Sequence, residues 1–196
     1  MAVEVAGGER LTAERVVLCG GLQSDRLARM AGGERWPAIV PFRGEYWALR
    51  PERRHLVRAL VYPVPDPRYP FLGVHLTLRF DGEVLVGPNA VVGLAREGYR
   101  WRDVVPADVA ELAGSRAFRA LARQHLRTGV DEVVRSLSRR RFAAAAAEHV
   151  PELRAEDLVR APAGVRAQAV ARDGSLVDDF AIEQTPRVLA VRNAPS

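Results

Sequence analysis

The chain has 196 residues, of which 48% are hydrophobic and 27% are charged, fractions that are typical of a globular protein and exclude a disordered or fibrous chain. All 29 basic residues are arginines spread along the chain, so compositional bias explains the net charge of +5 better than a polyanion-binding surface does. No stretch approaches the roughly 18 apolar residues of a membrane span, and the single cysteine excludes a disulfide framework, so we expect a soluble cytoplasmic protein.

The pattern of the N-terminal region predicts a strand, a glycine turn and a helix. Residues 15–19 run through three apolar positions into Gly20 and Gly21, which predicts a strand and a tight turn. Ser24 and Asp25 follow as candidate caps of a helix. Such a turn lets backbone amides approach a phosphate or a flat ring, but the GxGxxG fingerprint is absent. The turn by itself is therefore more typical of a structural element than of a ligand site.

The middle of the chain changes to a period of two. The pattern predicts strands over 42–49, 56–62 and 71–80, the last followed by a hairpin turn into a strand over 83–87. In the strand over 71–80, Phe80 falls on the apolar face with every second residue before it. We expect that face to be core and the opposite face to be open to a ligand.

Helical periodicity follows between residues 106 and 150. Pro106 suits the first position of a helix, Ser115 restarts the pattern, and Gly129 is expected to close it. A third helix then carries apolar positions that include Val133 and Leu137 and ends before residue 151.

Strand signals return near the C-terminus. They predict strands over 165–170, 176–182 and 188–191, with a turn at residues 173–174. The last residues, 193–196, resemble the entry to a further helix that this sequence does not contain.

Three side chains are candidates for chemistry. His75 lies on the face of its strand opposite the apolar one and suits a general base near neutral pH, with a hydrogen-bonded structural role as the alternative. Arg43 and Arg166 are bracketed by glycine and apolar residues, and the guanidinium fork matches a carboxylate. A structural salt bridge is the alternative for both arginines. The spacing of the histidines indicates no metal site.

Several runs together carry a family resemblance, including a Phe-Leu-Gly-Val-His run and a proline-rich run. The runs are 16–25, 41–46, 62–67, 71–75, 87–90, 96–99, 162–168 and 193–196. In this order they resemble the L-2-hydroxyglutarate oxidase/dehydrogenase family, a branch of the FAD-dependent D-amino-acid-oxidase-like (DAO) oxidoreductases. Gly20 departs from the family, which usually has alanine there.

The resemblance implies a mixed α+β or α/β fold in three parts. Residues 1–33 and 161–196 would be partial pieces of a Rossmann-like FAD/NAD(P)-binding domain, and residues 34–160 a substrate domain of antiparallel sheet and helices. The family's N-terminal GxGxxG region and a C-terminal helix would both be missing from this chain. We therefore expect the isolated polypeptide to bind FAD weakly or not at all and to show little turnover.

The resemblance also implies an activity, the oxidation of L-2-hydroxyglutarate to 2-oxoglutarate by hydride transfer to FAD. It assigns the catalytic base to His75, substrate binding to Arg166, Arg43 and Tyr62, cofactor binding to Gly20, Gly21, Ser24 and Asn193, and no metal.

The implied partners are a small dicarboxylate hydroxy acid and an electron acceptor, either oxygen or a quinone. The periphery of the inner membrane is the alternative to a purely cytoplasmic location. A related oxidase acting on glycerol 3-phosphate or an amino acid is an alternative activity. A basic module for nucleic acid or an anionic membrane surface is the alternative class, based on the arginine run 139–141, but no aromatic-interleaved basic strand supports it and no nucleic-acid partner is expected.

Overall fold

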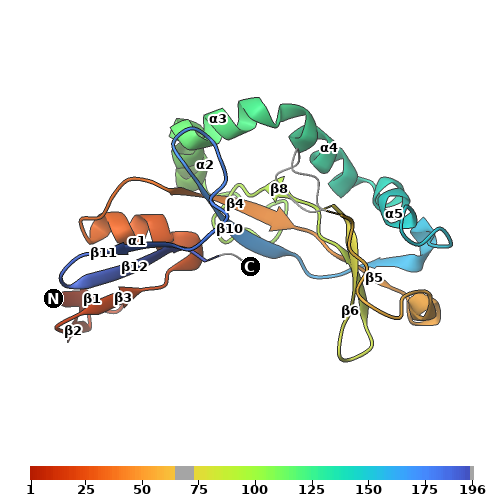
Figure 1. Cartoon of the computed structure of the whole chain (residues 1–196), viewed down its shortest axis with the longest axis horizontal. Helices are drawn as coiled ribbons and strands as arrows, with labels where there is room; N and C mark the ends of the chain where they lie inside the picture. Colours follow the sequence, from red (N-terminus) through yellow and green to blue (C-terminus); the bar gives the residue numbers. More distant parts are fainter. Residues whose placement is uncertain (65–72, 195–196) are drawn as a thin grey trace. The chain divides into compact units, whose positions relative to one another are not determined.

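The computed structural model in Figure 1 describes residues 1–64 and 73–194. These residues belong to two compact units, and the predicted domain boundaries at 33/34 and 160/161 stay predictions. Unit 1 comprises residues 1–40, 111–121 and 167–196, and unit 2 comprises residues 41–110 and 122–166. The second half of the proline-rich run over 62–67, the start of the predicted strand over 71–80 and the final Pro-Ser pair lie outside the described residues.

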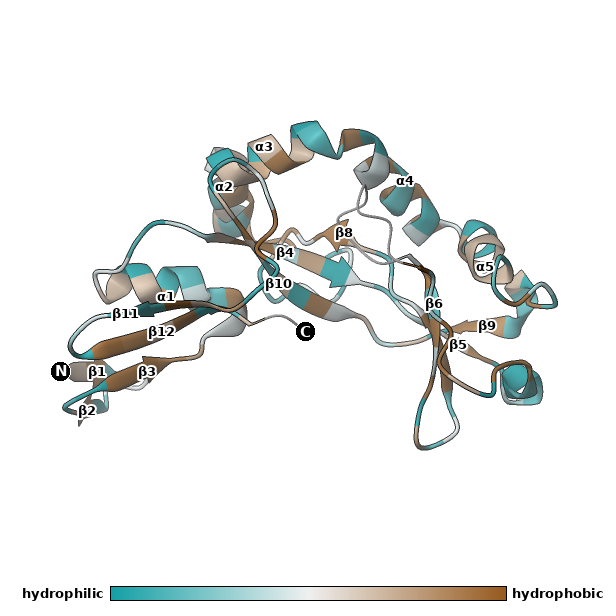
Figure 2. Ribbon diagram, viewed as in Figure 1, coloured by the Kyte–Doolittle hydropathy of each residue, from teal (hydrophilic) through white to brown (hydrophobic). Residues whose placement is uncertain are grey.

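Unit 1 contains a three-stranded sheet in the order β11–β12–β3. β12 (Val188–Asn193) pairs in parallel with β3 (Val16–Leu18) and antiparallel with β11 (Ala181–Gln184). The turn η1 (Gly21–Gln23) leads from β3 into α1 (Ser24–Met30), which packs on β12 and β3. The predicted succession of strand, glycine turn and helix is therefore confirmed. Figure 2 shows hydrophobic residues along β12 and β3.

The predicted capping of α1 by Ser24 and Asp25 is wrong. The N-cap of α1 is Gln23, and it makes no side-chain capping hydrogen bond. Ser24 Oγ instead donates to the carbonyl oxygen of Arg192 at 3.1 Å, and Asp25 Oδ2 accepts from the backbone N–H of Ile39 at 3.1 Å. Both side chains are buried, so they satisfy backbone groups of neighbouring segments rather than the helix end.

Two hairpins complete unit 1. β1 (Ala2–Glu4) pairs antiparallel with β2 (Arg10–Thr12), and all of their residues are exposed. The predicted turn at residues 173–174 is present, with Gly174 at φ +94°. A Cβ on Gly174 would lie 2.7 Å from the backbone nitrogen of Leu121, in helix α3 (Arg116–Gln124), so this turn requires glycine.

Unit 2 contains a four-stranded antiparallel sheet in the order β6–β7–β5–β9. Its strands are β6 (His75–Leu78), β7 (Val84–Gly87), β5 (Trp47–Leu49) and β9 (Leu158–Arg160). Neighbouring strands pair antiparallel throughout. β9 had no sequence signal of its own, because a three-residue strand is too short to show alternation.

The predicted strand over 42–49 is two strands in two sheets. β4 (Ala38–Gly44) belongs to a sheet in the order β10–β4–β8, with β8 (Val91–Val92) and β10 (Gly164–Val170). Glu45 and Tyr46 interrupt the pairing before β5 begins. Strand-forming apolar residues follow directly from Tyr46 to Leu49, so the sequence pattern did not separate the two strands.

The predicted strand over 56–62 is wrong. Residues 51–56 form a 3-10 helix, η2 (Pro51–Leu56), in which proline occupies the first turn. Extended pairing returns only as a single bridge between Val61 and Leu76. Pro51 has a φ fixed near the helical value and therefore favours a helix start. This local preference outweighed the alternating pattern that predicted a strand over 56–62.

Four helices follow β8. They are α2 (Pro106–Gly114), α3, α4 (Leu126–Leu137) and α5 (Arg139–Ala147). Gly129 does not close a helix as expected, since it lies inside α4; the break comes at Ser138, whose Oγ accepts from the backbone N–H of Arg141 at 3.3 Å and caps α5. Within the described ranges, no helix is long and apolar enough to cross a membrane.

The core of unit 2 lies between its four-stranded sheet and α5. Phe142 is fully buried there and meets the ring of Trp47 at a centroid distance of 6.1 Å. Phe80, expected on the core face, is instead 99% exposed, because β6 ends at Leu78 and Phe80 begins the turn. The other members of the core with no exposed surface are Leu76, Val84, Val86, Ala146 and Leu158.

The two phenylalanines offer a matched test of this core. Phe142→Ala is expected to lower the free energy of unfolding by about 3–5 kcal/mol, because it removes a ring from a closed core. Phe80→Ala removes the same atoms from an exposed site and is expected to change the free energy of unfolding by less than about 0.5 kcal/mol. Urea denaturation followed by circular dichroism measures both, and equal losses would contradict the described core.

Candidate functional site

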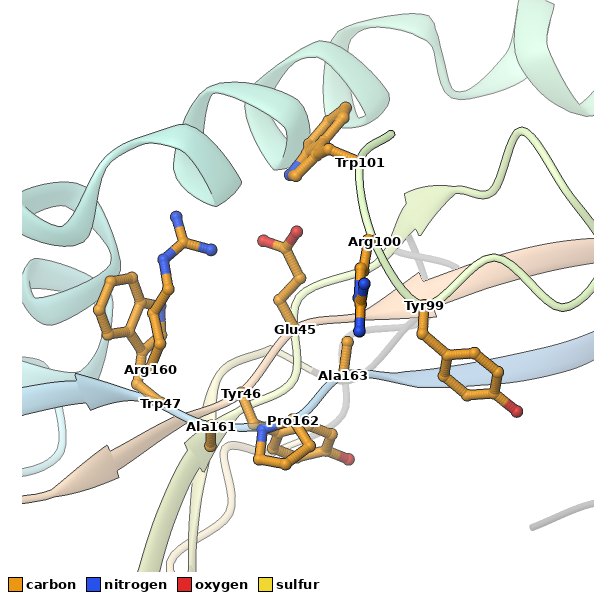
Figure 3. Close-up of a pocket in the computed structure, with 10 residues that line it drawn as sticks. All are labelled: Glu45, Tyr46, Trp47, Tyr99, Arg100, Trp101, Arg160, Ala161, Pro162 and Ala163. Carbon is orange, nitrogen blue, oxygen red and sulfur yellow. The ribbon is translucent and has the colours of Figure 1, made fainter. Parts of the chain in front are cut away.

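Unit 2 contains a cavity of about 490 Å³ at the corner between β4 and β5. Figure 3 shows the residues that line it. They are Glu45, Tyr46, Trp47, Tyr99, Arg100, Trp101, Arg160, Ala161, Pro162 and Ala163. The volume lies within the range of about 300–1,000 Å³ that is usual for small-molecule sites. Three segments distant in sequence therefore converge on one cavity.

Two glycines let the backbone segments at this corner approach closely. A Cβ on Gly44 would lie 2.8 Å from the Cβ of Pro88, and a Cβ on Gly87 would lie 2.8 Å from the carbonyl oxygen of Glu45. Gly87 also has φ +139°, a conformation that L side chains rarely adopt. The backbone N–H of Glu45 then donates to Asn89 Oδ1 at 2.8 Å. The runs 41–46 and 87–90 are thus held together as one structure.

The Glu45 carboxylate is buried and has two polar partners. Its Oε1 lies 3.4 Å from Nη2 of Arg43, and its Oε2 accepts a hydrogen bond from Ser136 Oγ in α4. Figure 3 shows the side chain pointing toward the loop that carries Trp101. Burying an unpaired carboxylate is expensive, so these partners are what allow it to lie there.

Arg43 is a buried cation beside the cavity. Its guanidinium carbon lies 4.3 Å from the ring centroid of Trp101, a cation–π contact, while the ion pair with Glu45 holds its other side. Burial lowers the pKa of Arg43, and the charges of Glu45 and Asp103 oppose that shift. The guanidinium stays protonated, because arginine retains its proton under all ordinary conditions.

Two buried donors next to Glu45 lack a hydrogen-bond partner among the described residues. They are Nε of Arg43 and Nδ2 of Asn89. Buried polar groups are almost always satisfied, so such atoms mark a place where water or a ligand completes the network. Arg100 and Arg160 also line the cavity, the latter with its guanidinium 5.2 Å from the ring centroid of Trp47. The arrangement suits an anionic ligand.

His75 and Tyr62 lie against each other, as a pair. Their ring centroids are 4.4 Å apart at an interplanar angle of 23°, a stacked arrangement. His75 Nδ1 lies 3.2 Å from the carbonyl oxygen of Gly73. A carbonyl can only accept, so Nδ1 carries the proton and the neutral ring keeps its lone pair on Nε2. Burial lowers the pKa of His75, which favours that neutral form.

Tyr46 connects this pair with the cavity. It lines the cavity, and it lies close enough to Tyr62 for that residue to raise the pKa of Tyr46, in addition to the larger effect of burial. His75 and Tyr62 themselves are not among the residues that line the cavity. Their position as catalytic and substrate-binding residues stays a prediction.

The predicted substrate arginines occupy different settings. Arg43 is buried against Glu45 and Trp101, so the structural salt bridge considered for it is present. Arg166 lies exposed on β10 and is not among the residues that line the cavity. Sequence reasoning missed Glu45, Arg100, Trp101, Ser136 and Arg160. Glu45 belongs to the run 41–46, which carries part of the family resemblance. The other four residues are distant in sequence, and only the fold brings them close to Glu45.

The predicted cofactor residues are all in unit 1. Gly20 and Gly21 follow β3, and Gly21 has φ +50° with nothing within 4 Å of the position of a Cβ. Ser24 Oγ is hydrogen-bonded to the backbone of β12. Asn193 Nδ2 donates to the carbonyl oxygens of Val177 and Asp179 at 3.0 and 2.7 Å, so its amide hydrogens hold the preceding loop. Cofactor contacts by these residues stay predictions.

No group of three or more potential metal-ligating side chains occurs within residues 1–64 and 73–194. The polar side chains of the described sites are arginines, a buried carboxylate, tyrosines and a histidine.

Comparison with known proteins gives a consistent result. Residues 2–194 match the family described as FAD dependent oxidoreductase (DAO). The chain is 50% identical over 186 residues to the mitochondrial L-2-hydroxyglutarate dehydrogenase of Nematostella vectensis, covering 92% of this chain and 41% of that protein. It is 48% identical over 190 residues to L-2-hydroxyglutarate dehydrogenase of Escherichia coli K12, covering 97% of this chain and 45% of the relative. The chain thus spans less than half the length of these relatives.

One solved structure supports the fold. The dithionite-reduced L-alpha-glycerophosphate oxidase of Mycoplasma pneumoniae, with FAD bound, superposes with a TM-score of 0.53 at 18% sequence identity. The match covers 90% of this chain and 36% of that one. It confirms the predicted mixed α+β fold.

The close approach at Gly87 generates a stability prediction. Gly87→Ala is expected to lower the free energy of unfolding by roughly 2 kcal/mol or more, because the new Cβ meets a backbone oxygen and the φ angle is strained. Gly114→Ala, at the end of α2 where a Cβ meets nothing within 4 Å, is the matched control and is expected to be neutral or slightly stabilising. Thermal denaturation measures both variants, and a harmless Gly87→Ala would contradict this geometry.

His75 generates a prediction about protonation. ¹⁵N-histidine NMR is expected to show the Nδ1–H tautomer and a pKa below the ordinary 6.5. The unfolded chain then takes up the proton first, so the free energy of unfolding should fall as the pH drops through about 6.5, and His75→Gln should remove that part of the slope. An Nε2–H tautomer would refute the hydrogen bond to Gly73.

Proposed function

The chain belongs to the FAD dependent oxidoreductase family, and we propose that it oxidises L-2-hydroxyglutarate to 2-oxoglutarate with FAD as cofactor. The observation that carries the substrate class is the cavity of unit 2, which Arg100 and Arg160 line while Arg43 balances the charge of Glu45. A dicarboxylate hydroxy acid presents two charges that guanidinium groups bind well. The identity to named L-2-hydroxyglutarate dehydrogenases supports the particular acid.

The reaction removes a hydride from the hydroxyl-bearing carbon and a proton from the hydroxyl oxygen, which leaves the ketone of 2-oxoglutarate. FAD, when bound, supplies a two-electron acceptor for the hydride. His75 takes the proton at Nε2, because the carbonyl oxygen of Gly73 keeps Nδ1 protonated. Tyr62 stacks on the ring and fixes its plane. The lowered pKa of His75 keeps the imidazole neutral at neutral pH, and the neutral ring can accept a proton.

The arginines bind and orient the substrate in this proposal. Arg100 and Arg160 pair with its carboxylates, since both line the cavity. Arg43 is buried beside Glu45 and Trp101, outside the cavity lining, and its positive charge adds to the attraction for the substrate carboxylates. The family resemblance adds Arg166 and Tyr62 as further substrate-binding residues.

The glycine turn of unit 1 fits a cofactor. Gly20 and Gly21 follow the carboxyl end of β3, and Asn193 ends the neighbouring parallel strand β12 at the same edge. Ligands of α/β folds bind at the carboxyl ends of parallel strands. The open space beside Gly21 lets a phosphate or a flat ring approach the backbone. We assign FAD contacts to Gly20 and Gly21, with Ser24 and Asn193 as flanking cofactor-binding residues.

The remaining partners follow from the reaction. The electrons collected from the hydroxy acid pass on to oxygen or to a quinone, and no nucleic acid takes part. We place the protein in the cytoplasm, with contact at the periphery of a membrane where a quinone is the acceptor.

A chimera tests the proposed activity. This chain replaces the matching part of the Escherichia coli relative, and the purified protein is assayed for bound flavin and for dye reduction with L-2-hydroxyglutarate, glycerol 3-phosphate and amino acids. Turnover of L-2-hydroxyglutarate alone is expected. A folded, flavin-loaded chimera that prefers glycerol 3-phosphate or an amino acid would overturn the substrate assignment.

Variants of the chimera separate the roles. His75→Gln is expected to lower kcat by about 10²–10⁴-fold, as for loss of a general base. Arg160→Gln is expected to raise KM by about 10–100-fold with a smaller effect on kcat, because a charged partner of the substrate is lost. Arg58→Gln, an exposed arginine outside the cavity, is the matched control and should behave as the parent. A His75→Gln variant with unchanged kcat would exclude His75 as the base.

A further inference from the structure

A row of residues crosses the sheet of unit 2 from β6 to the start of β5. His75 on β6 pairs with Gly87 on β7, and Tyr62 stacks on the ring of His75. The register of β5 and β7 extends the row to Tyr46, which immediately precedes β5 and lies next to Gly87. The row therefore consists of Tyr62, His75, Gly87 and Tyr46.

Gly87 leaves room in the middle of this row. A Cβ on Gly87 would lie 3.2 Å from Cδ1 of Tyr46, so a larger residue there would displace the Tyr46 ring. Two strand spacings, roughly 10 Å, separate the backbones of His75 and Tyr46. Side chains as long as those of histidine and tyrosine can meet across this separation, because the residue between them has no side chain.

His75 and Tyr46 lie on the face of the sheet opposite the core. Their neighbours Leu76 and Trp47 are buried in the core, and successive residues of a strand point to opposite faces. In Figure 3 the Tyr46 ring lies on the other side of its strand from the Trp47 ring. Tyr46 lines the cavity and His75 does not. A ligand in the cavity therefore meets Tyr46 before it meets His75.

Of the two hydroxyls in the row, that of Tyr46 suits a contact with Nε2 of His75. The lone pair of Nε2 lies in the plane of the imidazole, whereas Tyr62 stacks on the face of that ring. Burial raises the pKa of Tyr46, so the phenol keeps its proton. A protonated phenol can donate to one base and accept from another hydroxyl at the same time.

We propose that Tyr46 is a further catalytic residue, which takes the proton of the substrate hydroxyl at Oη and passes its own proton to Nε2 of His75. The O–H bonds of the substrate and of Tyr46 break, while a new O–H bond on Tyr46 and an N–H bond on His75 form. The electron pair of the C–H bond goes to the acceptor of the proposed oxidation, on which this inference rests. A general base can act through one intervening group, so His75 need not line the cavity.

The flavin-loaded chimera tests this relay. Tyr46→Phe removes only the hydroxyl and is expected to lower kcat by about 10²-fold or more, with KM and bound flavin changed by less than about threefold. Thr77→Val is the matched control, because it removes a hydroxyl two residues from His75 on the same face of the sheet and outside the cavity. It should keep kcat within about twofold of the parent.

A double variant separates the relay from a structural role. Residues that act as a unit lose their effect together, so Tyr46→Phe/His75→Gln should have a kcat within about threefold of that of His75→Gln alone. A structural role would multiply with the loss of the base. A further loss of about 10²-fold in the double variant would therefore overturn the proposal.

Histidine NMR of the 196-residue chain gives a readout that needs no turnover. A donor at Nε2 stabilises the neutral ring, so Tyr46→Phe should raise the pKa of His75 while Thr77→Val leaves it unchanged. A pKa of His75 that does not respond to Tyr46→Phe would overturn the proposal, because the two groups would then not meet.

The two proposals fail in different ways. A flavin-loaded parent chimera that does not oxidise L-2-hydroxyglutarate refutes the proposed oxidation and the relay with it. An active parent whose Tyr46→Phe variant keeps its kcat refutes the relay alone.

Discussion

The burial of Glu45 is the constraint on which the described site depends. A buried carboxylate needs polar partners, and Glu45 obtains them from Arg43 and from Ser136 of α4. Its backbone is tied to Asn89, and Gly87 leaves the space for that approach. One residue therefore fixes the corner between two strands, the run 87–90 and a helix that follows 91 residues later.

The electrostatics of the cavity follow from this arrangement. Glu45 alone would give the cavity a negative wall, but Arg43 balances it from a buried position and is itself covered by Trp101. The charge of the lining is then set by Arg100 and Arg160. The buried pair positions the corner, and the lining arginines give it affinity for an anion.

The same constraint explains the unusual orientation of α4. Glu45 and the backbone N–H of Ala90 both need a polar partner, and α4 supplies Ser136 and Glu132. A helix that turns these residues inward has to turn its stripe of leucines and valines outward. The inward contacts of Ser136 and Glu132 and the exposure of the leucines and valines on the other face of α4 therefore have the same cause, which is the way the helix packs on unit 2.

The sequence by itself determined the local elements whose signals are short-range: the strand, glycine turn and helix at 16–30, the hairpin turn at Gly174 and the helix start at Pro106. It also determined family membership, because runs of residues keep their order. Only the tertiary structure decided the break at Glu45, the burial of Ser136, the exposure of Phe80 and the convergence of Arg100 and Arg160 on one cavity. Periodicity records which side chains share a face of an element. Which face turns inward depends on partners far away in the sequence.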